Sequence, residues 1–244
     1  MGNSQCWKDV YHKLASDVSA GQFDVGKKLP SQTALATRYQ TGRHAIRRAL
    51  ERLGNEGVIS SRQGKAAVVV GQSITYQIDA KTRFASRLRE AGFDVRVAAL
   101  RLLASKGIDP RLAKMLNLNP RDKVGFAELL HHVNGVPTTL GRHYFNTHMF
   151  PDIIAAISAT SPSVPEAFRR IGVSDYARRS TIIEVRLPTA YEALTLEIPP
   201  TQPVLELLGQ NVDAQNATVE VTEAVVRTDT VKLMVENNQV GHLV

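Results

Sequence analysis

The sequence predicts an α+β protein with a small N-terminal domain of helices and a larger C-terminal domain built on an antiparallel sheet. The chain has 244 residues, of which 43% are hydrophobic, and this length suits two domains of ordinary size. Helical spacing of apolar residues dominates the first 70 residues, whereas strand-like runs and short helices alternate in the remainder. The charge is also uneven, because the first 70 residues account for +6 of the net +7.

The uneven charge indicates the kind of partner that each domain contacts. The first 70 residues hold 11 basic and 5 acidic side chains, a balance that favours contact with a polyanion such as nucleic acid. The single cysteine, Cys6, leaves no disulfide framework and no cysteine-based zinc site. The sequence opens without a secretory signal, and no apolar run approaches the ~20 residues that cross a bilayer. We therefore expect a soluble cytoplasmic protein with no membrane partner.

Three helices are predicted in the N-terminal domain. The first is followed by a Gly- and Pro-rich break, after which Ser31 is a suitable N-cap for a short second helix. Thr41-Gly42 then predicts a turn, and the run TGRHAIRRAL leads into a third helix. The apolar residues of the first helix recur at helical spacing: Trp7, Val10, Tyr11, Leu14 and Val18.

The third helix carries its charge on the side opposite its apolar residues. At about 100° per residue, His44, Arg47 and Arg48 point away from the apolar stripe, and Arg43 lies in the first turn. A hairpin of two short strands is predicted next, with the segment Arg62-Gln63-Gly64-Lys65 at its tip. Three helices and a basic hairpin in this order predict a winged helix-turn-helix fold. The apolar stripe consists of Ile46, Ala49, Leu50 and Leu53.

This arrangement predicts binding to double-stranded operator DNA by residues 1–70. In a helix-turn-helix the second helix of the turn enters the major groove, and Arg43 and Arg47 lie in its first turns. Arginine suits bidentate contact with the edge of guanine, and a hairpin tip at Gly64 suits the minor groove or the phosphate backbone. An arginine-rich helix alone is more often an ordinary solvated surface, but here the turn, the hairpin and the local charge agree.

The run KLPSQTALATRYQTGRHAIRRALERLGNEGVISSRQGKAAVV resembles the DNA-binding domain of the GntR family of bacterial transcription regulators. The resemblance covers residues 8–70 and is specific. Within that family, RHAIRRAL is most similar to the regulators of phosphonate utilisation. The resemblance implies that Arg43 and Arg47 contact bases, that His44 contacts a base or the backbone, that Ser31 and Arg48 contact phosphates, and that Gln63, Gly64 and Lys65 form the tip of the wing.

The sequence also departs from the family pattern. Gln32 and Thr33 stand where the family usually has an acidic and a basic residue, which puts one expected DNA contact in doubt. Gly42 replaces the usual Ser or Thr before the third helix, and Ala45 replaces a usual Thr. The pair Arg43 and Arg47 is retained, so the expected base contacts are unaffected.

The rest of the chain predicts a linker over residues 71–83 and a second domain over residues 84–244. Its clearest element is a hairpin around Asn134-Gly135, the strongest short turn signal. Strand-like runs interrupted by short helices predict an antiparallel sheet. In order, we expect a helix ending at Gly92, a strand over 95–105, a helix over 109–119, the hairpin over 124–145, helices over 150–159 and 164–172, a strand over 177–187, a helix over 189–198 and three strands within 203–237.

This second domain resembles the UTRA effector domain of the HutC branch of GntR regulators, which has a chorismate-lyase-like fold. The matching runs are RFASRLREAG, VNGVPTTLGRHYF, LEIPPTQPVLEL and TVEVTEAVVRTDTVKLMVE. The resemblance implies a domain that dimerises and binds a small effector, mostly an anionic one such as a phosphonate or phosphate ester, for which arginines and backbone N–H groups are suitable ligands. The candidate effector-binding residues are Arg83, Phe84, Ser86, His131, Arg142, His143, Tyr144, Arg178, Glu220 and Arg227.

The candidate effector residues also have plainer interpretations. Many relatives have arginine where this chain has His131, and others have an acidic residue where it has Arg142, so the ligand can differ from that of any relative. Glu220 and Arg227 are as well explained by a cross-strand ion pair on the sheet. The strand histidines, His131 and His143 among them, are better explained as ordinary half-exposed residues.

Other classes of protein fit the sequence less well. The sequence contains no nucleophile motif, phosphate-binding loop or HExxH motif, and we therefore expect no enzyme and no cofactor. A metal site is disfavoured because His131 and His132 are adjacent in a strand and point to opposite faces. A DNA-packaging protein would not need a near-neutral second domain. We expect a homodimeric, ligand-responsive repressor of a phosphonate uptake or degradation operon; the alternative is a regulator of aminosugar or amino-acid catabolism.

Overall fold

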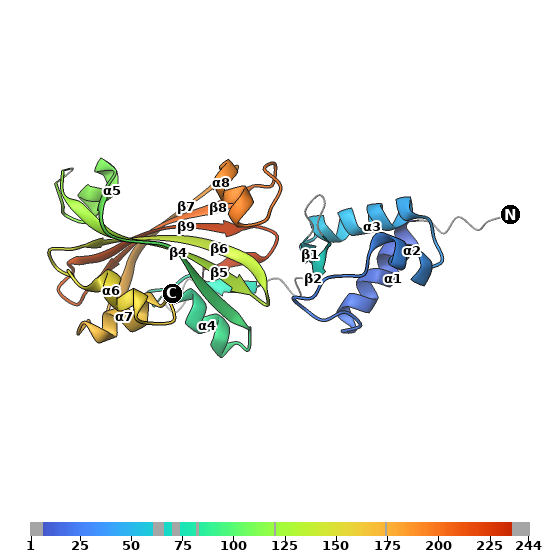
Figure 1. Ribbon diagram of the computed structural model, residues 1–244, viewed down its shortest axis with the longest axis horizontal. Coiled ribbons are helices and arrows are strands. Elements are labelled where there is room, and N and C mark those ends of the chain that lie inside the picture. Colours follow the sequence, from blue (N-terminus) through green and yellow to red (C-terminus); the bar gives the residue numbers. More distant parts are fainter. Residues whose placement is uncertain are drawn as a thin grey trace, which may run out of the picture.

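The computed structural model describes residues 7–60, 66–69, 74–81, 83–119, 121–173 and 175–235. Figure 1 shows a bundle of three helices at one end of the molecule and a sheet with helices on both faces at the other. The α+β class and the antiparallel sheet of the second domain therefore agree with the prediction from the sequence.

The N-terminal domain has three helices and a two-stranded hairpin, as predicted. Its core includes Val10, Leu35, Ile46 and Leu53, which are fully buried. Ser31 caps the second helix, because its hydroxyl accepts a hydrogen bond from the Ala34 backbone N–H at 3.2 Å. The elements are α1 (Trp7–Ser19), α2 (Gln32–Arg38), α3 (Arg43–Asn55), β1 (Ile59–Ser60) and β2 (Val68–Val69).

The C-terminal domain is built on a six-stranded sheet with the strand order β4-β5-β6-β9-β8-β7. All neighbouring strands in it are antiparallel, and the predicted hairpin around Asn134-Gly135 joins β5 and β6. The strands are β4 (Val95–Gly107), β5 (Lys123–Val133), β6 (Val136–Asn146), β7 (Ala177–Arg186), β8 (Val204–Val212) and β9 (Thr218–Arg227).

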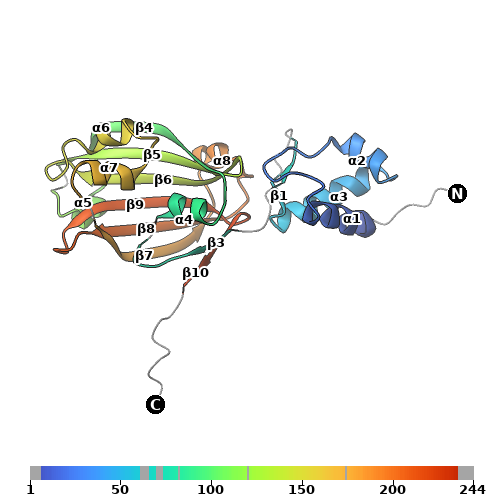
Figure 2. The same cartoon turned by 90° about the horizontal axis from the view of Figure 1, so that it is seen from below.

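Helices cover both faces of this sheet, with α4, α6 and α7 on one face and α5 and α8 on the other (Figures 1 and 2). The alternation of side chains along β5 explains how both faces are apolar, because Leu129 packs with α6 and α7 whereas Leu130 packs with α8. The helices are α4 (Phe84–Glu90), α5 (Pro110–Met115), α6 (Ile153–Ser158), α7 (Val164–Arg170) and α8 (Ala190–Thr195).

Part of the segment that the sequence predicts to be a linker is a strand. β3 (Ile74–Gln77) pairs in parallel with β10 (Val231–Met234), the last of the three strands expected near the end of the chain. Ile74 and Tyr76 are buried, and Thr75 between them is exposed. Such alternation over four residues is too short to distinguish a strand from an extended linker, and the partner strand lies at the other end of the sequence. Within the described residues, none of the helices has the length and apolar character needed to cross a membrane.

Candidate DNA-binding surface and effector cavity

The exposed side of α3 carries the residues predicted to contact DNA. Arg43, His44, Arg47 and Arg48 are exposed, as is Ser31 at the start of α2, because the apolar stripe of α3 faces the core. The remaining predicted DNA contacts, Gln63, Gly64 and Lys65, lie outside the described residues.

Two of these arginines have partners that leave their guanidinium groups accessible. Arg47 faces Glu51 one turn later, with Nε and Oε1 3.5 Å apart, and more than half of each side chain is exposed. An ion pair of this kind is worth at most about 1 kcal/mol, so it does not hold Arg47 away from a ligand. The Arg48 guanidinium lies over the ring of Trp7 at 4.8 Å, a cation–π contact that orients it. α3 begins at Gly42 without a side-chain cap, so its first backbone N–H groups stay available to an anion.

The second domain encloses a cavity of about 150 Å³ on the face of the sheet that α4 and α7 cover. Apolar side chains such as Leu129, Leu207 and Val226 form much of its wall. Seven of the ten residues predicted to bind an effector line this cavity: Arg83, Phe84, Ser86, His131, His143, Arg178 and Glu220.

A polar cluster lies at one end of this cavity. Arg178, Asn211 and Glu220 are opposite one another on β7, β8 and β9. The Glu220 carboxylate is 3% exposed, and its Oε1 lies 2.6 Å from Nδ1 of His143 while its Oε2 accepts a hydrogen bond from the Asn211 amide. Arg178 donates a hydrogen bond to the hydroxyl of Thr222 at 3.2 Å. The cavity therefore places a carboxylate and a guanidinium on the two strands that flank β8.

Glycine at position 209 makes room for the guanidinium of Arg178. Gly209 lies on β8 opposite Thr181 on β7, and a Cβ atom there would overlap the Arg178 guanidinium. Burial lowers the pKa of Arg178, whereas the charge of Glu220 raises it. Arginine nevertheless stays charged at physiological pH, so the cation is retained inside the domain.

Several buried polar atoms in the cavity have no hydrogen-bond partner among the described residues. They are Nδ1 of His131, Oγ1 of Thr139, Nε2 of His143, Oγ1 of Thr181 and Oδ1 of Asn211. Buried polar groups are normally hydrogen-bonded, so a cluster of unpartnered ones that faces a cavity indicates a binding site. Burial, reinforced by the charge of His143, lowers the pKa of His131 to about 3, and His131 is therefore neutral.

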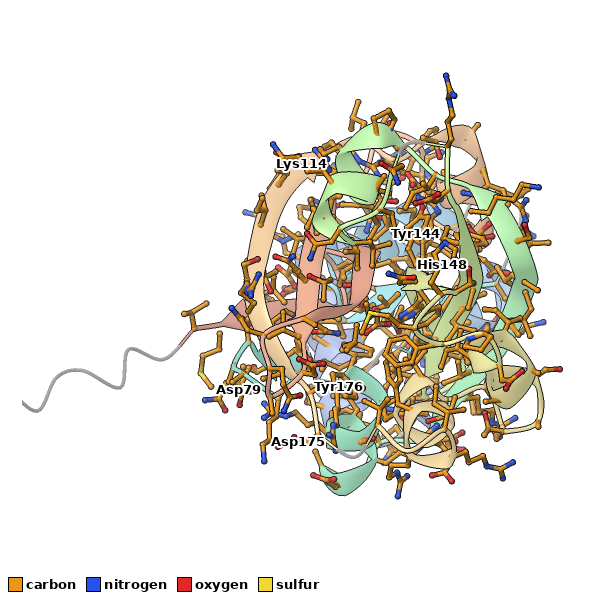
Figure 3. The ribbon with its side chains drawn as sticks, turned by 90° about the vertical axis from the view of Figure 1, so that its left-hand side faces the viewer. Asp79, Lys114, Tyr144, His148, Asp175 and Tyr176 are labelled. Carbon is orange, nitrogen blue, oxygen red and sulfur yellow. The ribbon has the colours of Figure 1, made fainter. Side chains whose placement is uncertain are left out.

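Three predicted effector residues lie away from the cavity. Arg142 contacts Glu128 and Glu192 at 3.0 Å each on the face of the sheet covered by α8, and Tyr144 donates a hydrogen bond to Glu223 on that face. Both residues neighbour His143 on β6, and alternating side chains of a strand point to opposite faces. Figure 3 shows Tyr144 toward α5 and Tyr176, which lines the cavity, toward α4.

The third, Arg227, is a buried cation at the boundary between the domains. It is 1% exposed and forms an ion pair with Asp229, with Nη2 and Oδ2 2.6 Å apart. Its guanidinium also donates hydrogen bonds to the carbonyl oxygens of Pro137 and Leu196. Glu220 lies seven residues earlier on β9, in the cluster with His143. The cross-strand pair of Glu220 and Arg227 that the sequence left open is therefore not formed.

Arg227 also contacts the N-terminal domain. Its Nη2 donates a hydrogen bond at 2.7 Å to the hydroxyl of Ser60, the last residue of β1. Next to it, Gly57 has φ +72° and approaches Asp229 so closely that a Cβ atom at this position would overlap the Asp229 carbonyl. We call these contacts of Gly57 and Ser60 with Arg227 and Asp229 the domain contact.

Thr139, Tyr176, Thr181 and Asn211 are among the cavity residues that the sequence did not indicate. Thr139 and Asn211 lie on predicted strands, but the face of the sheet to which their side chains point depends on the register between strands. The sequence of a single strand does not specify that register. Tyr176 immediately precedes β7, and the Arg83 guanidinium lies over its ring at 5.5 Å. Among the described residues, no group of three or more His, Cys, Asp or Glu side chains has a geometry that could hold a metal ion.

Each of the two domains matches the model of a known protein family. The model of "Bacterial regulatory proteins, gntR family" matches residues 7–69, and that of the UTRA domain matches residues 95–232. The uncharacterized HTH-type transcriptional regulator RB1450 of Rhizobium meliloti (strain 1021) is 28% identical, with 94% of each chain covered. The probable transcriptional regulator PhnF of Escherichia coli (strain K12) is 26% identical, with 95% of each chain covered.

Solved structures have the same fold. The crystal structure of PhnF from Mycobacterium smegmatis superposes with a TM-score of 0.62 at 20% sequence identity, covering 94% of this chain and 99% of that one. The C-terminal domain of a PhnF superposes with a TM-score of 0.52 at 24% identity, covering 66% of this chain and 99% of that one. At these identities the likeness shows the fold alone and not a shared ligand.

Proposed function

Because the chain belongs to the UTRA-domain branch of the bacterial gntR family of transcription regulators, we propose that it is a ligand-responsive repressor that binds operator DNA in the cytoplasm. One observation carries the proposal: a single chain joins an exposed arginine-bearing helix, α3, to a domain that encloses a cavity with unpartnered polar atoms. The first feature suits DNA and the second suits a small molecule.

In the proposed complex α3 lies in the major groove. Arg43 and Arg47 contact base edges, His44 contacts a base or the backbone, and Arg48, oriented by Trp7, contacts a phosphate. The remaining proposed contacts are to the backbone or minor groove, from Ser31 and from Gln63, Gly64 and Lys65 of the wing.

The repressor would bind as a homodimer, and the surface of β7 supports this proposal. β7 is an edge strand of the six-stranded sheet, and an edge strand can pair with a strand of another chain. Large apolar side chains gather on it and on the neighbouring α8, an arrangement that suits burial against a second copy of the chain. They are Ile182, Ile183, Val185, Leu187, Tyr191 and Leu194, which are 53%, 41%, 68%, 60%, 45% and 60% exposed.

The cavity and the DNA-binding domain are connected through the end of β9. Val226 and Val231 line the cavity, and the segment between them carries Arg227 and Asp229 of the domain contact. A ligand that displaces this segment would shift the position of the N-terminal domain. Such coupling is reciprocal, so operator DNA would weaken ligand binding by the same factor by which the ligand weakens DNA binding.

We propose that the regulated genes serve phosphonate uptake or degradation, on the basis of the likeness to PhnF and the resemblance of the α3 sequence. The alternative is regulation of aminosugar or amino-acid catabolism. It has support from a similar relative, the probable fructoselysine utilization operon transcriptional repressor of Escherichia coli (strain K12), which is 22% identical over 94% of this chain.

Selection from a randomised pool of duplexes tests the proposed DNA binding. The full-length protein should enrich an inverted repeat whose half-sites lie about one helical turn apart or a multiple of it, because dimer symmetry is mirrored in the operator. Melting of the protein with a panel of phosphonates, phosphate esters, sugar phosphates and amino acids then identifies the effector, since a ligand of the folded state raises the midpoint. A pool without any enriched sequence would contradict the assignment of operator binding.

A further inference from the structure

We propose that the cavity takes a small zwitterion, a molecule that carries a protonated amine and an acidic group a few bonds apart. This inference rests on the proposed function, in which the cavity is the effector site. It names the chemistry of that effector from the groups that line the cavity, and it adds a cationic end to the anionic ligand that the family resemblance implies.

The first step is a buried carboxylate that faces the cavity. Glu220 is 3% exposed, and both of its oxygens are held, one by His143 and one by the amide of Asn211. These two partners stabilise the buried carboxylate, and a carboxylate can accept about four hydrogen bonds in all, so Glu220 can still accept from a cationic group in the cavity. A purely anionic ligand would meet repulsion at this end.

The second step is that the neighbours of Glu220 present acceptors. The amide of Asn211 is used as a donor to Glu220, and its Oδ1 is therefore left as a buried acceptor without a partner. Nδ1 of His143 lies 2.6 Å from Oε1 of Glu220, and its Nε2 is a second buried atom without a partner among the described residues. An ammonium group has three N–H donors and no acceptor, and Glu220 and Asn211 offer it acceptors.

The third step is the opposite charge close by. Arg178 lines the cavity and faces Asn211 across β7 and β8, and its guanidinium lies over Gly209. Arg83 lines the same cavity, beside the ring of Tyr176 at 5.5 Å. A guanidinium matches the geometry of a carboxylate or phosphonate, and the hydroxyl of Thr181 is an additional unpartnered group in this wall.

The volume of the cavity favours a compact ligand. Its volume, about 150 Å³, equals that of an engineered cavity that binds benzene, which corresponds to about six to eight non-hydrogen atoms. A sugar phosphate has about twice as many, so the cavity suits a smaller ligand better. His131 is also neutral, so the position where many relatives have an arginine adds no charge for a phosphate dianion.

Calorimetry with five probes tests the zwitterion directly. The full-length protein is titrated with 2-aminoethylphosphonate and β-alanine, which carry both charges, with ethylphosphonate and propanoate, which lack the amine, and with ethylamine, which lacks the acid. At least one of the two zwitterions should bind about tenfold or more tightly than its counterpart without the amine and than ethylamine. The comparison of phosphonate with carboxylate identifies which acid the arginines prefer.

Variants assign the two ends of the ligand. Glu220→Gln keeps the size of the side chain but removes its charge, and it should lower affinity for the zwitterions about tenfold. The weak binding of ethylphosphonate and propanoate should increase, because the repulsion from Glu220 is removed. Arg178→Met should lower affinity for every probe that carries an acid. Glu223→Gln is the matched control, because Glu223 lies on the same strand but contacts Tyr144 on the other face of the sheet, and this variant should bind all probes as the wild type does.

The outcomes separate the two proposals. Equal or tighter binding of ethylphosphonate or propanoate to the wild type would overturn the zwitterion and leave an anion-binding effector site in place. Binding of none of the five probes, with a raised midpoint for a larger sugar phosphate, would overturn the ligand class alone. If none of the five probes binds and no compound of the melting panel changes the midpoint, both the ligand class and the role of the domain as an effector sensor are contradicted. The titration of the wild type decides the inference even if Glu220→Gln fails to fold.

Discussion

Arg47 is the residue whose removal most directly tests the DNA-binding surface. It is exposed on α3, where it forms a surface ion pair of little energetic value with Glu51. Arg47→Ala should therefore leave the free energy of unfolding within about 0.5 kcal/mol of the wild type. It should cost about 1–3 kcal/mol of binding to the selected operator and relax specificity at one base position, as measured by fluorescence anisotropy.

Arg52→Ala is the matched control for this substitution. Arg52 lies on the same helix near its C-terminal end, with its Nε 2.6 Å from Oε1 of Glu56, away from the turn that enters the groove. This variant should keep the ratio of operator to scrambled-sequence affinity. If Arg47→Ala retains that ratio as well, α3 does not contact bases through Arg47.

Single residues also show where prediction from sequence succeeds and where it stops. Helical periodicity placed Ile46 and Leu53 in the core and Arg47 on the surface, because one helix has one buried side. In the sheet both faces are covered by helices, so His143 and its neighbour Arg142 are each partly buried among polar partners on opposite sides. The composition of β6 does not show which side chain points to which face of the sheet. The register with β9, which sets Thr222 opposite His143, shows it.

At the scale of elements, the turn between β9 and β10 links the effector cavity to the N-terminal domain. β10 pairs with β3, which follows the N-terminal domain in the chain, and the turn before β10 carries Asp229 of the domain contact. The sequence predicted β10 as a strand but assigned residues 74–77 to a linker. Strand pairing between distant parts of a chain depends on tertiary packing, which local patterns do not contain.

Ser60→Ala should weaken the coupling between effector and operator. The substitution removes the hydroxyl that accepts a hydrogen bond from Arg227 across the domain contact, while β1 and the cavity keep their own contacts. We expect the factor by which the effector changes operator affinity to fall several-fold, because a hydrogen bond to a charged group contributes about 1.5–3 kcal/mol. The measurement is operator binding by anisotropy with and without the effector found in the melting panel.

Thr228→Ala serves as the control for that experiment. Thr228 follows Arg227 directly, but its hydroxyl donates to the carbonyl of Pro203 within the C-terminal domain. Removing it should leave the coupling factor at the wild-type value. A coupling factor that Ser60→Ala also leaves intact would show that the signal passes between the domains by another route.

At the scale of the whole molecule, one copy of the chain presents one α3, whereas an inverted-repeat operator requires two in a fixed relation. The exposed apolar side chains of β7 and α8 lie on the C-terminal domain, so a dimer formed there would leave both N-terminal domains available for DNA. The domain contact would then set the separation of the two copies of α3. Effector binding would change operator affinity by changing that separation, without touching any residue that contacts DNA.

Val185→Lys tests this arrangement, because Val185 is 68% exposed on the edge strand and a lysine there places a charge in the middle of the proposed interface. The free energy of unfolding of the isolated chain should change little, since the side chain is exposed, whereas the mass measured by light scattering should fall from that of a dimer to that of a monomer. Operator affinity should fall strongly as well, because each half-site is then bound independently. The control is Leu100→Lys, at a 39% exposed residue on β4 at the opposite edge of the sheet, and this variant should keep the dimeric mass. If Val185→Lys also remains a dimer, the interface lies on another surface.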